Sequence, residues 1–312
     1  MNNTVDPAGT AEPDWKQRPE RSNRAMLRTM TWITLTFGRR ASRWVLAGIS
    51  VYFLLFAPAA RRASRDYLSR ALGRAPRWRE LFAHFHCFAT TIHDRVFLLN
   101  NRFDLFTVEV HGEDLLLEVL AEGKGAFLMG AHMGSFELVR AIGRRQPGLR
   151  VGMVMYADNA SKINAALAAI NPDAQLDIVV LGRLDSMLRV RDRLDEGMIL
   201  GMLGDRSLEV GPTRALPFLG APAEFPIGPM RLAAMLRRPV IFMAGLHLGG
   251  NRYAIHFERL ADFSHTPAGG RDAVMQTTLE NYVACLERHC RATPYNWFNF
   301  YDFWQKPAGA ST

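Results

Sequence analysis

The chain has 312 residues, of which 48% are hydrophobic and 22% charged, and a formal net charge of +8. This length supports a large core, and the composition excludes a disordered, collagen-like or low-complexity protein. The net charge alone would suggest nucleic-acid binding. However, residues 21–80 hold 13 arginines and two acids, a net of +11, which leaves 25 basic and 28 acidic residues elsewhere. The basic charge therefore belongs to an N-terminal arm, and no nucleic-acid partner is expected.

Residues 1–20 are polar and contain Pro and Asp, which predicts a disordered N-terminus and not a signal peptide. The last residues, 306–312, are predicted to be disordered as well. Three cysteines, Cys87, Cys285 and Cys290, follow neither a disulfide nor a metal-binding spacing. This pattern indicates a reducing compartment for the globular part, and no metal site is expected.

The N-terminal arm, residues 21–80, contains an uncharged stretch of 17 residues from Trp44 to Ala60. As a helix it would be about 25 Å long, at the short end of what spans a hydrocarbon core of about 30 Å. Such a segment can cross the bilayer, lie in its interface with arginines on anionic head groups, or be a buried helix of a soluble protein. Membrane attachment is the interpretation favoured by the flanking arginines, Arg39, Arg40, Arg43, Arg61, Arg62 and Arg65.

After the arm, residues 81–305 alternate between helical and strand-like patterns and are predicted to form one catalytic domain. The order indicates βαβ units, so the fold class is α/β, with a mostly parallel central sheet flanked by helices and an N-terminal membrane-associated helix. Helices are predicted over Arg61–Leu72, Trp78–Asn100, Glu113–Glu122, Phe136–Arg145, Ala160–Ile170, Met187–Glu196, Pro226–Leu236 and Ala273–Arg291. Strands are predicted over Phe106–Val110, Ala126–Gly130, Val151–Tyr156, Asp177–Leu181, Met198–Leu203, Pro239–Leu246 and Arg252–Phe257.

The most informative stretch runs from Gly125 to Arg140, GAFLMGAHMGSFELVR. A buried strand is followed by His132 and, five residues later, by Glu137 in the first turn of a helix. In open α/β sheets, ligands bind beyond the carboxyl ends of strands, which is where His132 lies. No phosphate loop, GxGxxG fingerprint or GxSxG elbow occurs in the chain, so neither a nucleotide cofactor nor a serine nucleophile is expected.

A histidine with a neighbouring carboxylate suits general-base activation of a hydroxyl. The neutral imidazole takes the proton of an alcohol, and the carboxylate fixes the tautomer. Glu137 lies near enough in sequence to be that carboxylate. The alternative is equally consistent with these residues: His132 would be a strand-end histidine, and Glu137 a carboxylate stabilised by the helix dipole.

The stretch GAFLMGAHMGSFELV resembles the H-x4-[DE] block of the lysophospholipid and glycerolipid acyltransferase superfamily. It is most similar to the late acyltransferases of lipid A biosynthesis, the lauroyl and myristoyl transferases. Two further blocks follow in the family's order: Gly197–Gly220, with Asp205-Arg206 at a strand end and a PFLG sequence, and Ala221–Val240. The resemblance covers Arg40 to Trp304. The sequence Asp205-Arg206-Ser207 and the aromatic ending NWFNFYDFW differ from the family pattern. These differences predict a divergent branch of the family.

The resemblance implies a membrane-bound O-acyltransferase of the bacterial inner membrane, with the catalytic domain on the cytoplasmic side. The donor substrate is then an acyl thioester of acyl carrier protein or coenzyme A, no cofactor is needed, and the acceptor is a hydroxyl of a membrane lipid such as a lipid A precursor. His132 would be the base and Glu137 its partner. Residues expected to contact substrate are Asp205, Arg206, Arg183, Gly134, Ser135, Pro217, Phe218 and Gly220.

Acyl carrier protein is acidic, so its docking surface is expected among the arginines between Arg61 and Arg79. Two other functions stay open at this point. The same His–Glu pair could activate water in a thioesterase or lipid hydrolase. The chain could also be a non-catalytic lipid-binding scaffold.

Overall fold

The computed structural model describes residues 24–139, 142, 146, 148–156, 160–161, 165, 168, 170–171, 177–182, 185–206 and 211–304. The ends predicted to be disordered, residues 1–20 and 306–312, lie outside the described residues, and so does Arg183. The helices predicted over Phe136–Arg145 and Ala160–Ile170 are described only in part.

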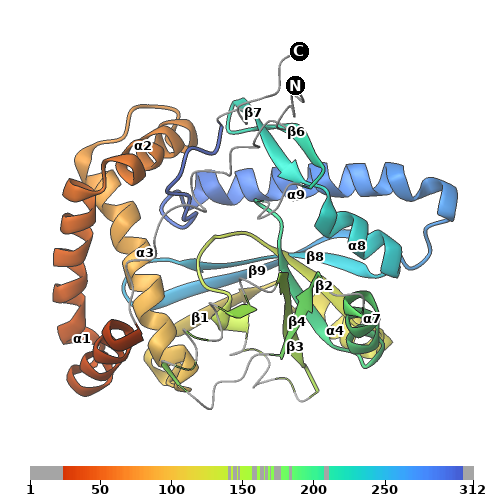
Figure 1. The fold of residues 1–312 in the computed structure, drawn as a ribbon, viewed down its shortest axis with the longest axis horizontal. Helices are drawn as coiled ribbons and strands as arrows, with labels where there is room; N and C mark the ends of the chain where they lie inside the picture. Colours follow the sequence, from red (N-terminus) through yellow and green to blue (C-terminus); the bar gives the residue numbers. More distant parts are fainter. Residues whose placement is uncertain are drawn as a thin grey trace, which may run out of the picture.

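A seven-stranded sheet forms the centre of the fold (Figure 1). Its strands are β1 (Thr107–His111), β2 (Ala126–Gly130), β3 (Val151–Tyr156), β4 (Asp177–Leu181), β5 (Ile199–Leu203), β8 (Pro239–His247) and β9 (Arg252–Asp262). In space they follow the order β1-β9-β8-β2-β5-β3-β4. Five of them, β8, β2, β5, β3 and β4, run parallel, whereas β9 is antiparallel to β8 and β1 is parallel to β9. The predicted α/β fold with a mostly parallel sheet is confirmed.

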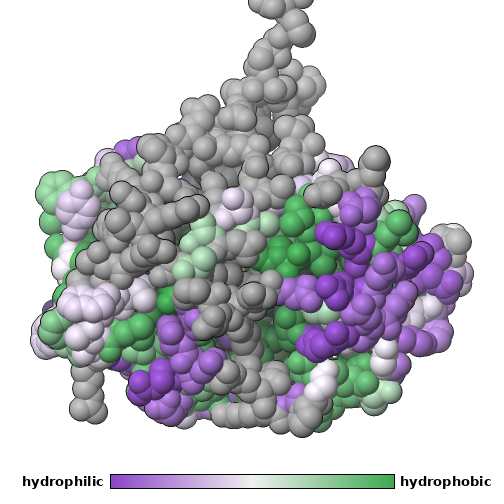
Figure 2. Space-filling model, turned by 60° about the horizontal axis from the view of Figure 1, so that its bottom comes forward, coloured by the Kyte–Doolittle hydropathy of each residue, from purple (hydrophilic) through white to green (hydrophobic). Residues whose placement is uncertain are grey.

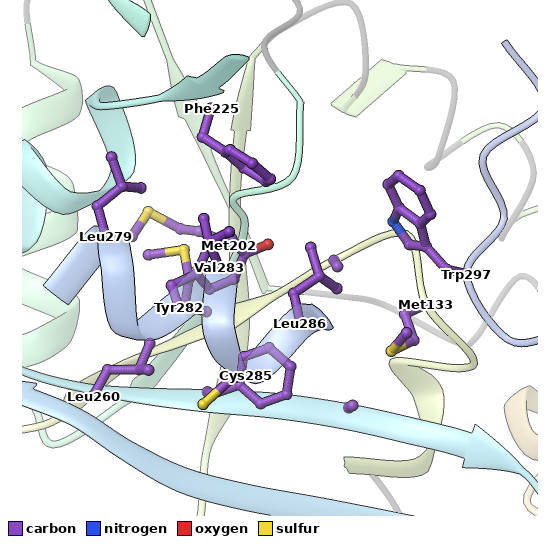
Figure 3. Close-up of a cluster of buried hydrophobic side chains, with 14 of the residues drawn as sticks. Met133, Met202, Phe225, Leu260, Leu279, Tyr282, Val283, Cys285, Leu286 and Trp297 are labelled. Atoms are coloured by element: carbon purple, nitrogen blue, oxygen red, sulfur yellow. The ribbon is translucent and has the colours of Figure 1, made fainter. Parts of the chain in front are cut away.

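The sheet is buried on both faces, which explains why β2 is an unbroken apolar run. Side chains alternate along a strand, so Phe127 and Met129 belong to one core cluster and Ala126 and Leu128 to the other. Side chains of α7 (Ser186–Asp195), α8 (Gly228–Leu236) and α9 (Arg271–Ala292) complete the first cluster, and those of α4 (Glu113–Glu122) the second. Figure 3 shows the α9 side chains of the first cluster facing Met202 and Phe225.

A two-stranded hairpin, β6 (Thr213–Phe218) with β7 (Ala221–Pro226), lies outside the main sheet. Its turn residues, Leu219 and Gly220, have φ values of 50° and 83°. Two consecutive positive φ values are the signature of the tight turn whose twist matches antiparallel strands. The sequence reasoning did not predict this hairpin.

The N-terminal arm forms α1 (Arg24–Phe56) and α2 (Pro58–Leu72), and α3 (Trp78–Leu99) begins at its end. Gly38 kinks α1 with a φ of 74°, and α2 follows at an angle of 96° to the second part of α1. Within the described residues, no helix by itself is long and apolar enough to cross a bilayer. The bent pair Ala41–Phe56 and Pro58–Leu72 meets that criterion only jointly.

A buried ion pair fastens α1 to the rest of the molecule. Arg39 donates two hydrogen bonds of 2.7 Å to the two carboxylate oxygens of Asp94 on α3, whose side chain is 1% exposed. The hydroxyl of Tyr253 on β9 donates to the same carboxylate at 2.8 Å. Because this geometry is bidentate and nearly dry, the ion pair fixes the arm against the edge of the sheet.

The outer side of α1 is apolar. Of the 17 exposed large apolar side chains that the structure describes, ten lie on this helix, among them Trp32, Phe37, Trp44, Tyr52 and Phe56. Figure 2 shows hydrophobic surface along the left edge of the molecule, where Figure 1 places α1, and the largest hydrophilic surface on the opposite side. A contiguous apolar patch of this kind marks an interaction surface.

Candidate active site

Two neighbouring strands of the sheet bring His132 and Asp205 together. Strands β2 and β5 are paired in parallel, with Gly130 opposite Leu203 at their carboxyl ends. His132 follows the last residue of β2 by two positions, and Asp205 follows the last residue of β5 by the same interval. The two side chains therefore meet at the edge of the sheet where open α/β folds bind ligands.

Asp205 is buried, with 2% of the residue exposed, and is held by three donors. Its Oδ1 lies 2.9 Å from Nδ1 of His132, and its Oδ2 accepts from the backbone N–H of His132 at 3.0 Å and from Nε1 of Trp297 at 3.0 Å. Burial alone would raise the pKa of this carboxyl. The charge and hydrogen bonds of His132, with Arg206 nearby, instead hold that pKa well below its usual range. Asp205 is therefore a carboxylate at neutral pH.

The position of Asp205 fixes the tautomer of His132. Because a carboxylate only accepts, Nδ1 carries the ring proton, and Nε2 has the free lone pair. Burial lowers the pKa of His132, an effect that Asp205 opposes and Arg206 reinforces, so the imidazole is neutral at pH 7. The side chain is still 29% exposed and can be reached from outside. This is the arrangement of a general base.

Arg206 lies against the imidazole of His132. Its Nε is 3.0 Å from Nδ1 and 3.1 Å from Nε2 of the ring. Because the two distances are nearly equal, this nitrogen lies over the face of the ring and not in line with the lone pair of Nε2. Arg206 also stacks over Tyr301, with 5.4 Å between its Cζ and the ring centroid. A cation is thus placed beside the imidazole.

In the structure, His132 contacts a carboxylate other than that of the predicted partner Glu137. The carboxylate that contacts the imidazole is that of Asp205, whereas Glu137 lies 2.8 Å from Nε of Arg95 on α3 and accepts from the Ser135 hydroxyl at 3.0 Å. Glu137 is 8% exposed in its side chain and begins the helical turn after the His132 loop. It joins that loop to α3 and does not orient the imidazole.

Gly134 and Ser135 shape the loop that carries His132. The N–H of Gly134 donates to the carbonyl of Asn296 at 2.9 Å, and the N–H of Ser135 donates to Gly245 on β8 at 2.8 Å. With a φ of 60°, Gly134 approaches β8 so closely that an added Cβ would lie 1.8 Å from the Gly245 carbonyl oxygen. These backbone groups are therefore engaged within the protein, and the predicted substrate contact of this segment stays a prediction.

Comparison with protein families gives the decisive observation. The model of the bacterial lipid A biosynthesis acyltransferases matches residues 25–306. The chain belongs to this family. The predicted resemblance is thereby confirmed, and the chain is an acyltransferase whose family acts in lipid A biosynthesis and is associated with the bacterial inner membrane. Comparison with individually curated proteins gave no match.

The site of this acyltransferase includes a segment that sequence reasoning did not assign to it. Asn296, Trp297 and Phe298 run beside the His132 loop, with a β-bridge between Met133 and Trp297. The N–H of Phe298 donates to the carbonyl of His132 at 2.7 Å. The run of aromatic residues was visible in the sequence as a departure from the family pattern. Its place beside Asp205 was not, because 92 residues separate Trp297 from Asp205.

Pro217, Phe218 and Gly220, expected to shape the wall of the acyltransferase site, lie on the β6–β7 hairpin. Phe218 is fully buried against Trp297, with 5.3 Å between the ring centroids. Pro217 lines a separate depression of about 740 Å³ between β6 and α9. Of these three residues, Phe218 is connected to the site, through its contact with the ring of Trp297.

Proposed function

We propose that the protein transfers a fatty acyl group from an acyl thioester to a hydroxyl of a lipid acceptor, with His132 as the general base. The observation that carries this proposal is the buried Asp205 carboxylate on Nδ1 of His132, at 2.9 Å, which leaves Nε2 free to take a proton. Membership of the lipid A acyltransferase family supports a precursor of lipid A as acceptor.

The reaction begins when the acceptor hydroxyl lies beside Nε2 of His132, in the plane of the ring. As the hydroxyl oxygen attacks the thioester carbonyl, its proton passes to Nε2, and a C–O bond forms. The imidazolium is stabilised by Asp205, whose depressed pKa keeps it ionised throughout. No covalent acyl-enzyme is needed, because the acceptor oxygen is itself the nucleophile.

The tetrahedral intermediate carries a negative charge on the former carbonyl oxygen. Arg206, which contacts the ring of His132, supplies electrostatic stabilisation of that oxygen in this proposal. The intermediate then collapses, the C–S bond breaks, and the thiolate leaves with the proton held on Nε2. The products are an acyl ester and a free thiol, and His132 returns to its neutral form.

The remaining predicted site residues take supporting roles in this proposal. Glu137 and Ser135 hold the loop of His132 in place through the contact with Arg95. Phe218, with its neighbours Pro217 and Gly220, forms the wall behind Trp297. Arg183 is proposed as a contact for an acceptor phosphate.

Attachment to the membrane is proposed to occur in the interface, with the catalytic domain on the cytoplasmic side. The second part of α1, 16 residues from Ala41, would be about 24 Å long, short of the hydrocarbon core of about 30 Å. The 96° bend after it then turns α2 aside. Exposed rings such as Trp44, 84% exposed, would enter the boundary between head groups and acyl chains while arginines contact anionic head groups.

The experiment that tests the proposed function is mass spectrometry of the products. Purified protein is incubated with saturated acyl thioesters of acyl carrier protein and of coenzyme A, with and without a hydroxyacylated glycolipid precursor of lipid A. We expect one new acyl ester of the glycolipid, formed only with acceptor present and absent with His132→Ala. Release of free fatty acid at the same rate without acceptor would identify a thioesterase instead. Wild-type ester formation by His132→Ala would exclude the base assignment.

A further inference from the structure

Trp297 joins the catalytic carboxylate to the surrounding protein. Its indole N–H donates to Oδ2 of Asp205 at 3.0 Å, opposite the side on which Oδ1 receives Nδ1 of His132. Within the described residues, Trp297 is the only side chain besides His132 with a hydrogen bond to this carboxylate. The orientation of the carboxylate plane therefore depends on the indole together with the backbone N–H of His132, which donates to the same Oδ2 at 3.0 Å.

The backbone around Trp297 brackets the His132 loop on both sides. The carbonyl of Asn296 accepts from Gly134, and the N–H of Phe298 donates to His132 at 2.7 Å. Trp297 is thus placed by its neighbours at a fixed distance from the base. A side chain held in this way has little freedom to lose when it makes its hydrogen bond, which increases the net strength of that bond.

The indole ring itself is locked by packing. Trp297 is fully buried, and its ring makes edge contacts with Tyr67, Phe218 and Phe303 at centroid distances of 4.9, 5.3 and 4.9 Å. Figure 3 shows Trp297 beside Met133, at the border of the main buried cluster. Packing of the ring therefore directs the indole N–H toward Asp205, in addition to the hydrogen bond itself.

We propose that Trp297 is a positioning residue for acyl transfer: its indole N–H orients Asp205, and Asp205 in turn holds His132 with the proton on Nδ1 and the lone pair on Nε2. The inference rests on the proposed function, in which His132 is the base. Without the indole N–H, the carboxylate would keep only the two donors of His132 itself and would be held less firmly about its Cβ–Cγ bond. His132 would then be less well oriented toward the acceptor hydroxyl.

Two variants of Trp297 remove the indole N–H and keep an aromatic side chain at this position. Trp297→Phe leaves an aromatic side chain in the cluster, and replacement of Trp297 by 3-benzothienylalanine exchanges the N–H for sulfur with almost no change of shape. The matched control is Trp304→Phe, because Trp304 belongs to the same aromatic cluster but its Nε1 donates to the carbonyl of Phe218 at 3.3 Å. If Trp297→Phe unfolds, the benzothienyl variant decides the outcome.

We expect kcat for acyl ester formation to fall about 10- to 100-fold in both Trp297 variants, the range typical for loss of a hydrogen bond to a charged or positioning group. KM should change less than about twofold, because Trp297 is buried behind Asp205. The acid limb of the pH dependence of kcat/KM should move to higher pH, because a carboxylate with one donor fewer attracts the proton of His132 more strongly. Trp304→Phe should leave kcat, KM and the acid limb unchanged.

A readout independent of activity is the ¹⁵N spectrum of the His132 imidazole, assigned by its loss in His132→Ala. The wild type should show protonated Nδ1 and bare Nε2, and the benzothienyl variant a mixture of tautomers and a raised pKa. Unchanged kcat, pH profile and imidazole spectrum in a folded Trp297 variant would overturn the inference. If His132→Ala remains active, the proposed function fails instead, whatever the spectrum of Trp297 variants shows.

A double-substitution cycle with Asp205→Asn completes the test. If Trp297 acts through Asp205, the loss of kcat from Trp297→Phe should shrink to less than about threefold once Asp205 has been replaced. A full additional loss in that background would show that Trp297 acts on activity by another route and would overturn the inference.

Discussion

Gly134 occupies a place in the His132 loop where other residues cannot fit. Its φ of 60° is unfavourable for residues with a Cβ, and that atom would lie 1.8 Å from the carbonyl oxygen of Gly245. The strand β8 and the loop approach each other here through the bridge of Gly134 with Gly245. The glycine is thus what allows His132 to follow β2 so closely.

Gly134→Ala is predicted to lower the free energy of unfolding by about 3 kcal/mol, since the backbone clash and the positive φ act together. Any folded fraction should have kcat reduced more than tenfold, because the loop that carries His132 must move. Gly228→Ala is the matched control: Gly228 has no atom within 4 Å of the added Cβ and opens a helix. Equal stability of the two variants in denaturant unfolding would contradict this account of the loop.

At the scale of single residues, the sequence predicted His132 but not its partner. A histidine just beyond a buried apolar strand is recognisable, because open α/β sheets bind ligands there. Asp205 was also singled out, yet as a substrate contact. Its pairing with His132 depends on β2 and β5 being neighbours in the sheet. The two residues are 73 positions apart, and the sequence between them does not indicate that the strands are neighbours. Without that information, Glu137 was predicted as the partner of His132 because the two are close in sequence.

At the scale of elements, His84 connects the arm to the site. Its Nε2 contacts the carbonyl of Trp297 at 2.8 Å, and its Nδ1 contacts the hydroxyl of Ser64 at 2.8 Å. Because a carbonyl only accepts, the ring proton is on Nε2, and Ser64 donates to Nδ1. Helices α2 and α3 are thereby joined to the segment that holds Asp205.

His84→Phe is predicted to lower the free energy of unfolding at pH 7 by about 1–3 kcal/mol, because the buried Ser64 hydroxyl and the Trp297 carbonyl lose a partner. The ring of Phe300, stacked on His84 at 4.6 Å, can still pack on the new side chain. An exposed histidine, His265, provides the control substitution.

The same variant tests a pH dependence of stability. Burial lowers the pKa of His84 from 6.5 to about 4. Between these values the unfolded chain binds a proton that the folded chain does not, so stability rises with pH and is lost as the pH falls from 6.5 to 4. The wild type should lose on the order of 3 kcal/mol over this window that His84→Phe does not lose. Denaturant unfolding at pH 7 and pH 4.5 measures it, and a constant difference between the two proteins would refute the assignment.

Most helices and strands were predictable from their patterns. The bounds of α4, β2, β3 and β4 agree with the prediction, because buried apolar strands and glycine-terminated helices are distinct in sequence. The β6–β7 hairpin was missed, since Pro217 and Pro222 face each other in it and proline argues against a strand. The stretch Trp44–Ala60 was treated as one segment, whereas Pro58 starts a new helix after a bend of 96°.

At the scale of the whole molecule, the apolar side of α1 is the surface proposed to contact the membrane. Trp44→Ala with Phe56→Ala removes two side chains that are 84% and 65% exposed. We predict binding to vesicles of phosphatidylethanolamine and phosphatidylglycerol at least about 10-fold weaker, because each ring contributes about 1.5–3 kcal/mol when buried. Leu188→Ala, a change at an exposed side chain on α7, should leave binding unchanged. Co-sedimentation measures both, and equal binding by all variants would contradict an interfacial arm.

The arginines of α2 and α3 form the proposed surface for acyl carrier protein. Arg62 and Arg79 are exposed and belong to the basic arm. Arg62→Glu with Arg79→Glu should raise KM for acyl-acyl carrier protein about tenfold and change kcat less than twofold, since reversed charges weaken encounter and not chemistry. Arg191→Glu, at an exposed position on α7, serves as the control. Steady-state kinetics at low salt would exclude this docking surface if KM stayed the same.

The central claim is that His132, oriented by Asp205, is the base that activates the acceptor hydroxyl. The most direct measurement is the rate of acyl ester formation by His132→Ala under saturating donor and acceptor, with folding verified by thermal unfolding. The account predicts a loss of about 10²- to 10⁴-fold in kcat, the contribution of a positioned general base. A folded variant that keeps more than a tenth of the wild-type rate would contradict it.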